Sequence, residues 1–279
     1  MSLADTTRAP LLLDNLTGLT ADAVAAADTL LARASHAVRE LVSVDDKVSA
    51  ARLEEEQFAA HGLAWFATYV EALRQLHAYA ARMSEEGRLG EIEALLVQAA
   101  FGEYLWQLYG GIPMSQGEIL RPQDMGLSQD DQRALMVSAV QTLTQQGNSA
   151  AVRDRIVEII TEQAGAATYG DAGLDETLNA IRDQMRRFAD EQVTPFAHDW
   201  HLKNDYIPLE VLQQMAELGV FGLTIPEEFG GLGLGKESMC VVSEELSRGY
   251  IGVGSLGTRS EIAAELILGG GTPEQKAHW

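Results

Sequence analysis

Between residues 207 and 233 the chain reads Ile207-Pro-Leu-Glu-Val-Leu-Gln-Gln-Met-Ala-Glu-Leu-Gly-Val-Phe-Gly-Leu-Thr-Ile-Pro-Glu-Glu-Phe-Gly-Gly-Leu-Gly233. Pro208 suits the first turn of a helix, where its missing N–H leaves no bond unmade. Gly219 suits the left-handed position that ends a helix. An apolar turn and a glycine-rich loop follow. The stretch therefore predicts a short helix with a tight turn at its end.

The residues on either side of this stretch continue the helical pattern. From Leu174 to Asp199 apolar side chains recur every three or four residues, which predicts an amphipathic helix. Further helices are expected over residues 238–248 and 255–268. The second half of the chain is therefore expected to be helical, with the glycine-rich loop as its main irregular segment.

Several side chains of this half can be assigned to the core or to the surface. Cys240 stands between Met239 and Val241 on an apolar helix face, which predicts a buried cysteine. The charged side chains expected to be solvated are Glu244, Glu245, Arg182, Arg186 and Arg187.

The first half of the chain also has a helical composition. From Thr20 to about Gly147 Ala, Leu, Glu, Gln and Arg dominate, and no proline occurs before Pro113. Long helices with short connections imply an antiparallel bundle, and no strand pair is expected. The fold class is therefore predicted as all-α. The predicted segments are a mobile amino-terminus (1–19), a helical extension (20–150), a short helix with a linker (151–173) and a second helical domain (174–279).

Individual residues mark where these helices start and stop. Thr20 is a plausible cap for the first long helix, and Gly62 is a possible interruption of the second. Ser128, followed by Asp131, suits a helix amino-terminus. Thr272 before Pro273 restarts a helix with a cap and a first-turn proline.

Composition excludes several classes of partner. The chain has 20 Lys and Arg against 41 Asp and Glu, a net charge of −21, which disfavours nucleic acid and anionic membrane surfaces. Cys240 is the only cysteine, so an internal disulfide is excluded and a cytoplasmic location fits. The apolar run Leu11-Leu12-Leu13 is too short for a signal peptide core or a membrane span.

Two sequence motifs of the second half resemble ligand-binding motifs but are incomplete. Residues 230–236 have the glycine-to-lysine spacing of a phosphate-binding loop, but Glu237 stands where Ser or Thr would bind magnesium. His198 and His201 could share a helix face and bind a metal, but no further histidine lies nearby. We therefore expect an ordinary loop and no metal site.

Arg259 is a more informative cation, because small residues surround it in Gly254-Ser-Leu-Gly-Thr-Arg259-Ser-Glu-Ile-Ala-Ala. One interpretation is a surface arginine that pairs with Glu261 or another acid. The other is a guanidinium that holds the carboxylate of a substrate through two hydrogen bonds. The residues alone leave both open.

The order of motifs from Leu174 onward resembles the amino-terminal helical domain of the acyl-CoA dehydrogenases. A long helix precedes a short one that ends in Leu218-Gly-Val-Phe-Gly222, and Ile225-Pro-Glu-Glu-Phe-Gly-Gly-Leu-Gly233 follows. Ser243-Glu-Glu-Leu-Ser247 and Gly271-Thr-Pro-Glu-Gln-Lys276 complete the order. Residues 174–279 carry all of these motifs, most of which are turns and core positions.

The resemblance implies a role for the helix predicted over residues 255–268. In relatives the corresponding helix lines the deep end of the acyl pocket, and an arginine there is a feature of members that act on dicarboxylyl-CoA esters. Arg259 would then hold a distal carboxylate, with hydroxyls lent by Ser255 and Thr258. A branched C4-dicarboxylyl-CoA is the substrate that this resemblance favours.

The extension carries a second, weaker resemblance. Tyr104-Leu-Trp-Gln107-Leu-Tyr-Gly110-Gly111 is similar to a segment of the family's carboxyl-terminal helical domain that touches flavin across a subunit interface. Pro113 departs from the pattern, since relatives usually have glycine there. We therefore interpret Gln107 and Gly110 as structural remnants, in a bundle that occupies the surface where other members dock a second dimer.

The family resemblance also implies a reaction and partners. Members bind FAD, and a carboxylate base removes the α-proton while the β-hydrogen leaves as hydride. The base and most flavin contacts belong to later domains, so no catalytic residue is expected within this chain. The expected partners are an acyl-CoA substrate, further copies of the protein and electron-transfer flavoprotein. The alternatives are a non-catalytic helical assembly module and a dehydrogenase for another short acyl-CoA.

Overall fold

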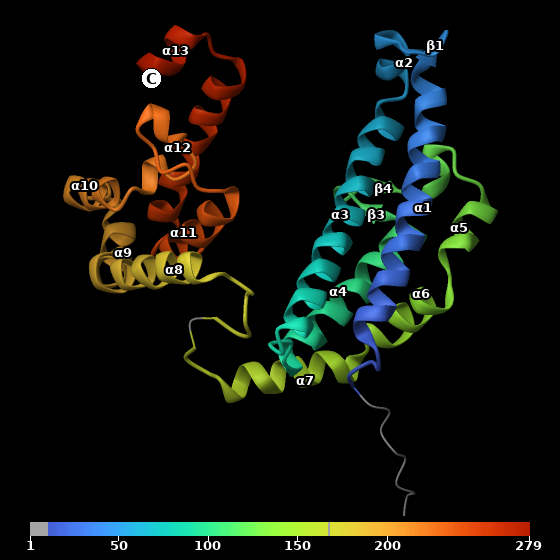
Figure 1. Ribbon diagram of the computed structural model, residues 1–279, viewed down its shortest axis with the longest axis horizontal. Helices are drawn as coiled ribbons and strands as arrows, with labels where there is room; N and C mark the ends of the chain where they lie inside the picture. The colour runs from blue at the N-terminus through green and yellow to red at the C-terminus, as the bar shows by residue number, and fades with distance from the viewer. Residues whose placement is uncertain (1–10, 167) are drawn as a thin grey trace, which may run out of the picture. The chain divides into compact units, whose positions relative to one another are not determined.

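The computed structural model describes residues 11–166 and 168–279. It divides the chain into two compact units, Met1–Gly173 and Leu174–Trp279, here called the extension and the second unit (Figure 1). Helices make up most of both units, which confirms the all-α class. The only strands among the described residues are two antiparallel pairs of two residues each, in the extension. The expectation of no strand pair is wrong for these two hairpins.

Two long helices run side by side through the extension, α1 and α3 (Figure 1). The elements of the extension are α1 (Leu16–Val42), β1 (Ser43–Val44), β2 (Lys47–Val48), α2 (Ala50–Glu55), α3 (Gln57–Glu85), α4 (Glu91–Gly110), β3 (Ile112–Pro113), β4 (Ile119–Leu120), η1 (Pro122–Met125), α5 (Gln129–Leu135), α6 (Ser138–Thr142), η2 (Leu143–Gly147) and α7 (Ala150–Glu162).

The core of the extension follows from the stripe that α1 buries. Ala23, Ala27 and Ala34 are fully buried and alternate with the larger Leu30 and Val38 at helical spacing. Small side chains let α3 and α4 approach α1 closely, and the larger ones fill the space between the helices. The bundle predicted for this half is therefore present, with α7 packed against α4 at one end.

The amino-terminal end of α1 differs from the sequence expectation. Residues 1–10 of the segment predicted as mobile lie outside the described residues. The helix begins at Leu16 rather than at Thr20, and Thr20 is a core residue whose hydroxyl lies 2.9 Å from Nδ1 of His77. The buried Gln98 side chain accepts from the N–H of Leu13 and donates to the carbonyl of Leu11. Residues 11–13 are thus attached to α4 by hydrogen bonds.

The helix breaks in the extension also differ in part. The expected interruption at Gly62 is wrong, because α3 continues through it and the break lies at Glu56. Gly62 is needed instead for packing, since a Cβ there would overlap the side chain of Leu120. The cap predicted at Ser128 is confirmed, because its hydroxyl accepts from the N–H of Asp131 at 3.1 Å.

The helices of the second unit pack around one core. Its elements are α8 (Glu176–Phe188), η3 (Ala189–Val193), α9 (Thr194–Lys203), α10 (Leu209–Glu217), η4 (Val220–Gly222), η5 (Glu227–Phe229), α11 (Lys236–Gly249), α12 (Ile251–Gly270) and α13 (Pro273–His278). In Figure 1, α8 lies across the end of the α11 and α12 pair, and α11 contacts both.

Glycines allow α12 to lie close against α11. A Cβ at Gly254 would overlap the side chain of Ser247, and one at Gly257 would lie 3.0 Å from Val220 and 3.2 Å from Met239. The resulting contact fixes which face of α12 is buried. The Gly219 left-handed position is confirmed with φ 78°, and so is the cap at Thr272.

Candidate functional site

The candidate site lies on the face of α12 that points away from α11. Val253, Gly254 and Gly257 are buried on the inner face. The outer face has three large aliphatic side chains, exposed to 74%, 61% and 71%: Ile251, Ile262 and Leu266. Steps of three, four and seven residues place such side chains in one stripe along a helix. We call this stripe, with Ser255 and Arg259 between its apolar members, the outer face of α12.

The structure brings Arg259 and Ser255 together on this face. They are one helical turn apart, and Nη1 of Arg259 donates to Oγ of Ser255 at 3.4 Å. Thr258 differs, because its hydroxyl donates to the carbonyl of Ser255 at 2.9 Å. The guanidinium and one hydroxyl thus lie side by side, and the Thr258 proton is engaged within the helix.

No carboxylate occupies Arg259 among the described residues, because the nearby acids bond elsewhere. Glu261 accepts from Nζ of Lys236 at 2.7 Å, and the same ammonium also bonds Glu265. The suggested pairing of Arg259 with Glu261 is therefore wrong. No acid stands three or four residues from Arg259, where it could pair along the helix. Its side chain is exposed.

The chemistry of the outer face suits a short acyl chain that ends in a carboxylate. A guanidinium binds a carboxylate through two parallel N–H···O bonds, and the aliphatic neighbours suit the alkyl carbons. A flavin ring would instead require several donors for its ring nitrogens and oxygens. The outer face offers one guanidinium and one hydroxyl, so we assign none of its residues to the flavin.

The loop of residues 230–236 is a packed turn. A Cβ at Gly231 would overlap the carbonyl of Ile225, so this glycine is required by close backbone approach. Lys236, the lysine of the near-miss phosphate motif, bonds Glu261 and Glu265 of α12. Its ammonium therefore ties the start of α11 to α12.

A charge cluster with a buried carboxylate at its centre joins α8, η3 and α11, and it was not predicted from the sequence. Glu245 is only 1% exposed, and Arg186 donates to it from α8 through Nε at 3.0 Å and through Nη2. Arg248 donates to it at 3.2 Å and to Asp190 at 2.8 Å. The expectation that Glu245 and Arg186 are solvated is wrong. The sequence spacing could have predicted the burial of Glu245, because Glu245 lies four and three residues after Val241 and Val242, which are buried on the same face of α11.

The pairing also shifts the titration of Glu245. Burial alone would raise its pKa, but the hydrogen bonds from Arg186 and Arg248 outweigh burial and leave the pKa below the usual 4.5. Glu245 is thus held as a carboxylate that links α11 to α8, and Arg248 extends the cluster to Asp190 of η3.

The structure also shows the surroundings of three further residues or pairs singled out from the sequence. Cys240 is exposed, so the expected burial is wrong. His198 and His201 lie on α9, and within the described ranges no three His, Cys, Asp or Glu side chains form a metal-binding group. In the extension, Nε2 of Gln107 donates to Glu103 at 2.7 Å, while its buried Oε1 has no hydrogen-bond partner.

No helix in the described part of the chain combines the length and apolarity needed to cross a bilayer.

Comparison with known proteins gives two kinds of match. Residues 175–279 match the family model described as acyl-CoA dehydrogenase, N-terminal domain. Over 270 residues, which are 97% of this chain, the sequence is 60% identical to a (2S)-methylsuccinyl-CoA dehydrogenase of Cereibacter sphaeroides. The matched region is 48% of that relative, so the chain spans about half its length.

Two further relatives match over a smaller part of the chain. A mitochondrial 2-methylacyl-CoA dehydrogenase of Solanum tuberosum is 35% identical over 37% of this chain and 26% of its own length. A glutaryl-CoA dehydrogenase of Desulfococcus multivorans is 37% identical over 28% of this chain and 21% of its own length. The match to the methylsuccinyl-CoA enzyme thus takes in the extension as well. The motif order, the helical fold and these matches identify residues 175–279 as an acyl-CoA dehydrogenase amino-terminal domain.

Proposed function

We propose that this chain works as the amino-terminal part of a dehydrogenase that oxidises (2S)-methylsuccinyl-CoA to mesaconyl-CoA. The observation that carries the proposal is the 60% identity to a (2S)-methylsuccinyl-CoA dehydrogenase over nearly the whole chain. The outer face of α12 supports it, because its one guanidinium has no carboxylate partner among the described residues. A methylsuccinyl group supplies a carboxylate of that kind.

In this proposal Arg259 holds the distal carboxylate of the substrate. Two N–H···O bonds would fix both the position and the rotation of that carboxylate. Ser255, already in contact with the guanidinium, would orient it and add a hydroxyl. Thr258 remains part of the proposed site because it is next to Arg259 in the helix. We assign it no bond to the ligand, since its hydroxyl donates to the carbonyl of Ser255.

Orientation is the contribution that this chain would make to the reaction. Anchoring the far end of a four-carbon acyl group limits the positions that its α- and β-carbons can take. The aliphatic side chains of the outer face would exclude water around these carbons. FAD, which the family implies, would take the β-hydrogen as hydride when bound. We place the base and the flavin contacts outside this chain.

The proposal also covers the location of the complete protein and its protein partners. We propose that the complete protein is a cytoplasmic homo-oligomer and passes electrons to electron-transfer flavoprotein, as full-length relatives are expected to do. The absence of cysteines other than Cys240 fits a reducing compartment.

Substitution of Arg259 tests the proposal in the complete protein. Arg259→Leu should lower kcat/KM for methylsuccinyl-CoA by about 30-fold or more, because loss of one partner of a bonded charge pair costs at least about 2 kcal/mol. The rate with an acyl-CoA that lacks the second carboxylate should change little. Steady-state kinetics with both substrates measure this difference.

Arg187→Leu is the matched control, because Arg187 is an exposed arginine on α8 and not on the outer face of α12. It should leave both rates unchanged. Equal rates of the parent protein and the Arg259→Leu variant with methylsuccinyl-CoA would exclude the carboxylate-binding role. A complete protein that binds no flavin would favour the non-catalytic assembly module instead.

A further inference from the structure

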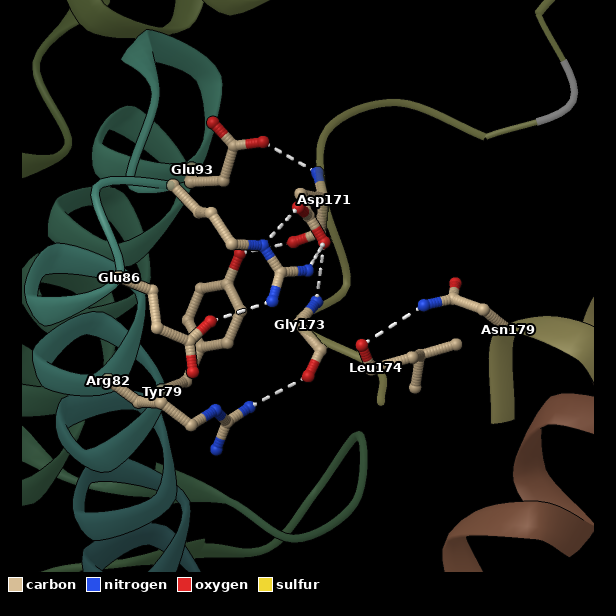
Figure 2. A network of polar contacts seen from close by, with 9 residues as sticks. Tyr79, Arg82, Glu86, Glu93, Asp171, Gly173, Leu174 and Asn179 are labelled. Atoms are coloured by element: carbon tan, nitrogen blue, oxygen red, sulfur yellow. Dashed lines mark hydrogen bonds and ion pairs between the residues drawn. The ribbon is translucent and has the colours of Figure 1, made fainter. Parts of the chain in front are cut away.

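The last residues of the linker, 170–173, are held against the ends of α3 and α4. Figure 2 shows this contact, in which side chains of the extension reach both the backbone and the one acidic side chain of the segment. The sequence, rich in glycine and alanine from Gly165 to Gly173, predicts instead a flexible linker. We call residues 170–173 the strap.

Asp171 makes the central contacts of the strap. Arg88 donates to both of its carboxylate oxygens, from Nε at 3.0 Å and from Nη2 at 2.8 Å. The backbone N–H of Asp171 donates to Glu93 at 2.6 Å, and Glu93 is only 7% exposed. The carboxylate of Asp171 also accepts from the N–H of Gly173 at 2.8 Å. An exposed ion pair alone contributes little, but a buried carboxylate that binds the backbone adds a contact that water replaces poorly.

The carbonyl groups of the strap are bound as well. The hydroxyl of Tyr79 donates to the carbonyl of Asp171, and Arg82 donates to the carbonyl of Gly173 at 3.1 Å. Polar groups of the strap backbone are thus paired with α3 and α4, as in a packed element rather than in a free linker.

Two glycines give the strap a shape that fits this surface. Gly170 and Gly173 have φ values of 76° and 70°, in the left-handed region that favours glycine. A Cβ at Gly170 would lie 2.9 Å from Glu93, and one at Gly173 would lie 2.8 Å from Arg82 and 3.1 Å from Tyr79. The left-handed backbone therefore favours glycine at both positions, and a larger residue would also displace the side chains of Glu93, Arg82 and Tyr79.

Hydrogen bonds within the second unit hold the chain directly after the strap. Asp175 caps α8 by accepting from the N–H of Leu178 at 2.7 Å, and the carbonyl of Leu174 accepts from Asn179 at 3.0 Å. Gly173 and Leu174 are consecutive residues, and the carbonyl of the first is bound by the extension while that of the second is bound by α8.

We propose that the strap makes residues 170–173 a fixed part of the extension, so that the connection to the second unit pivots at the Gly173–Leu174 junction alone. Release of the strap would free residues 170–173, a length of chain with a reach of up to about 14 Å. The contacts of Arg88, Glu93 and Tyr79 therefore limit the range of orientations open to the two units.

Hydrogen exchange of the full chain tests this proposal. In the parent protein the amides of Asp171 and Gly173 should be protected. Arg88→Gln should speed their exchange by about tenfold or more, as expected for the loss of charge-assisted hydrogen bonds. Tyr79→Phe, which removes one hydroxyl and keeps the ring, should speed it by a smaller factor. Amides of the α3 and α4 core report whether each variant stays folded.

Arg155→Gln is the matched control, because Arg155 makes a similar two-bond pair with Glu91 in the same unit, and its partners among the described residues are all acids outside the strap. It should leave exchange at the strap unchanged. Pulsed distance measurements between one spin label on each unit should give a broader distribution in Arg88→Gln than in Arg155→Gln. Unprotected amides at Asp171 and Gly173 in the parent protein, or equal distributions in the two folded variants, would overturn the proposal.

Discussion

Glu245 is a buried carboxylate whose loss should destabilise the second unit. Its carboxylate is buried and receives hydrogen bonds from Arg186 and Arg248. Breaking a buried charge pair leaves the remaining charges without compensation, which costs about 3–5 kcal/mol. Glu245→Gln should therefore lower the free energy of unfolding of the second unit by about that amount at neutral pH, as measured by urea denaturation.

The neighbouring Glu244 provides the control, since it is exposed. Glu244→Gln should change the free energy of unfolding by less than about 0.5 kcal/mol. Equal losses in the two variants would show that the buried cluster adds nothing specific.

The same residue predicts a dependence on pH. The pKa of Glu245 in the folded chain lies below the 4.5 of a free glutamate, so the folded state binds its proton less readily than the unfolded state does. Its stabilisation is therefore present above about pH 4.5 and is lost as pH falls through the lower, folded pKa. The difference in unfolding free energy between the parent protein and Glu245→Gln should shrink below pH 4.5.

Residue identity alone predicted some positions and missed others. Arg259 stands out as a single cation among small residues, but the residues alone left a surface ion pair and a carboxylate-binding role open. Only the family resemblance favoured the second role, which stays a prediction. Glu245 and Arg186 were missed because a charged side chain is solvated by default, and only a partner from another helix reverses this. Cys240 was missed because its apolar neighbours in sequence do not share its face of α11.

At the scale of elements, the helix starts that depend on local chemistry were predictable. Ser128 and Thr272 cap α5 and α13 through bonds to residues three positions ahead, and such bonds are encoded within one turn. Thr20 and Gly62 were misassigned because their environment is tertiary. Thr20 bonds His77 of α3, and Gly62 is covered by Leu120 of β4.

The packing of η2 on α4 gives a testable consequence of this kind. A Cβ at Gly147 would overlap the backbone carbonyl of Gln98, an atom that cannot move without disturbing α4. Gly147→Ala should therefore lower the free energy of unfolding of the extension by about 1–3 kcal/mol. Thermal or urea denaturation of the full chain measures the change.

Gly110 is the matched control for this substitution. A Cβ at Gly110, the last residue of α4, would meet no atom within 4 Å. Gly110→Ala should be neutral or slightly stabilising, because alanine has the higher helix propensity. A larger loss at Gly110 than at Gly147 would contradict the packing described for η2.

At the scale of the whole molecule, the sequence was most informative where motifs follow one another in a fixed order. The order from Leu174 to Lys276 predicted the family of the second unit, and the match over residues 175–279 confirms it. The extension has no such order, and its helices were predicted from composition, from the absence of proline and from cap residues. Its strap could not be predicted, because side chains from α3 and α4 hold a glycine-rich segment that by itself is typical of a flexible linker.

The function proposed for the whole molecule assigns the outer face of α12 to the distal carboxylate of the substrate. Within the described residues the Arg259 guanidinium has no carboxylate partner and shares this face with exposed aliphatic side chains, as expected if a dicarboxylyl-CoA completes the surface. The account therefore depends on the substrate reducing the flavin of the complete protein.

Anaerobic mixing of the purified complete protein with acyl-CoA esters is the most direct measurement. The flavin absorbance should bleach rapidly with (2S)-methylsuccinyl-CoA and far more slowly with an ester of similar length that lacks the second carboxylate. Equal bleaching by both esters, or none with methylsuccinyl-CoA, would contradict the account.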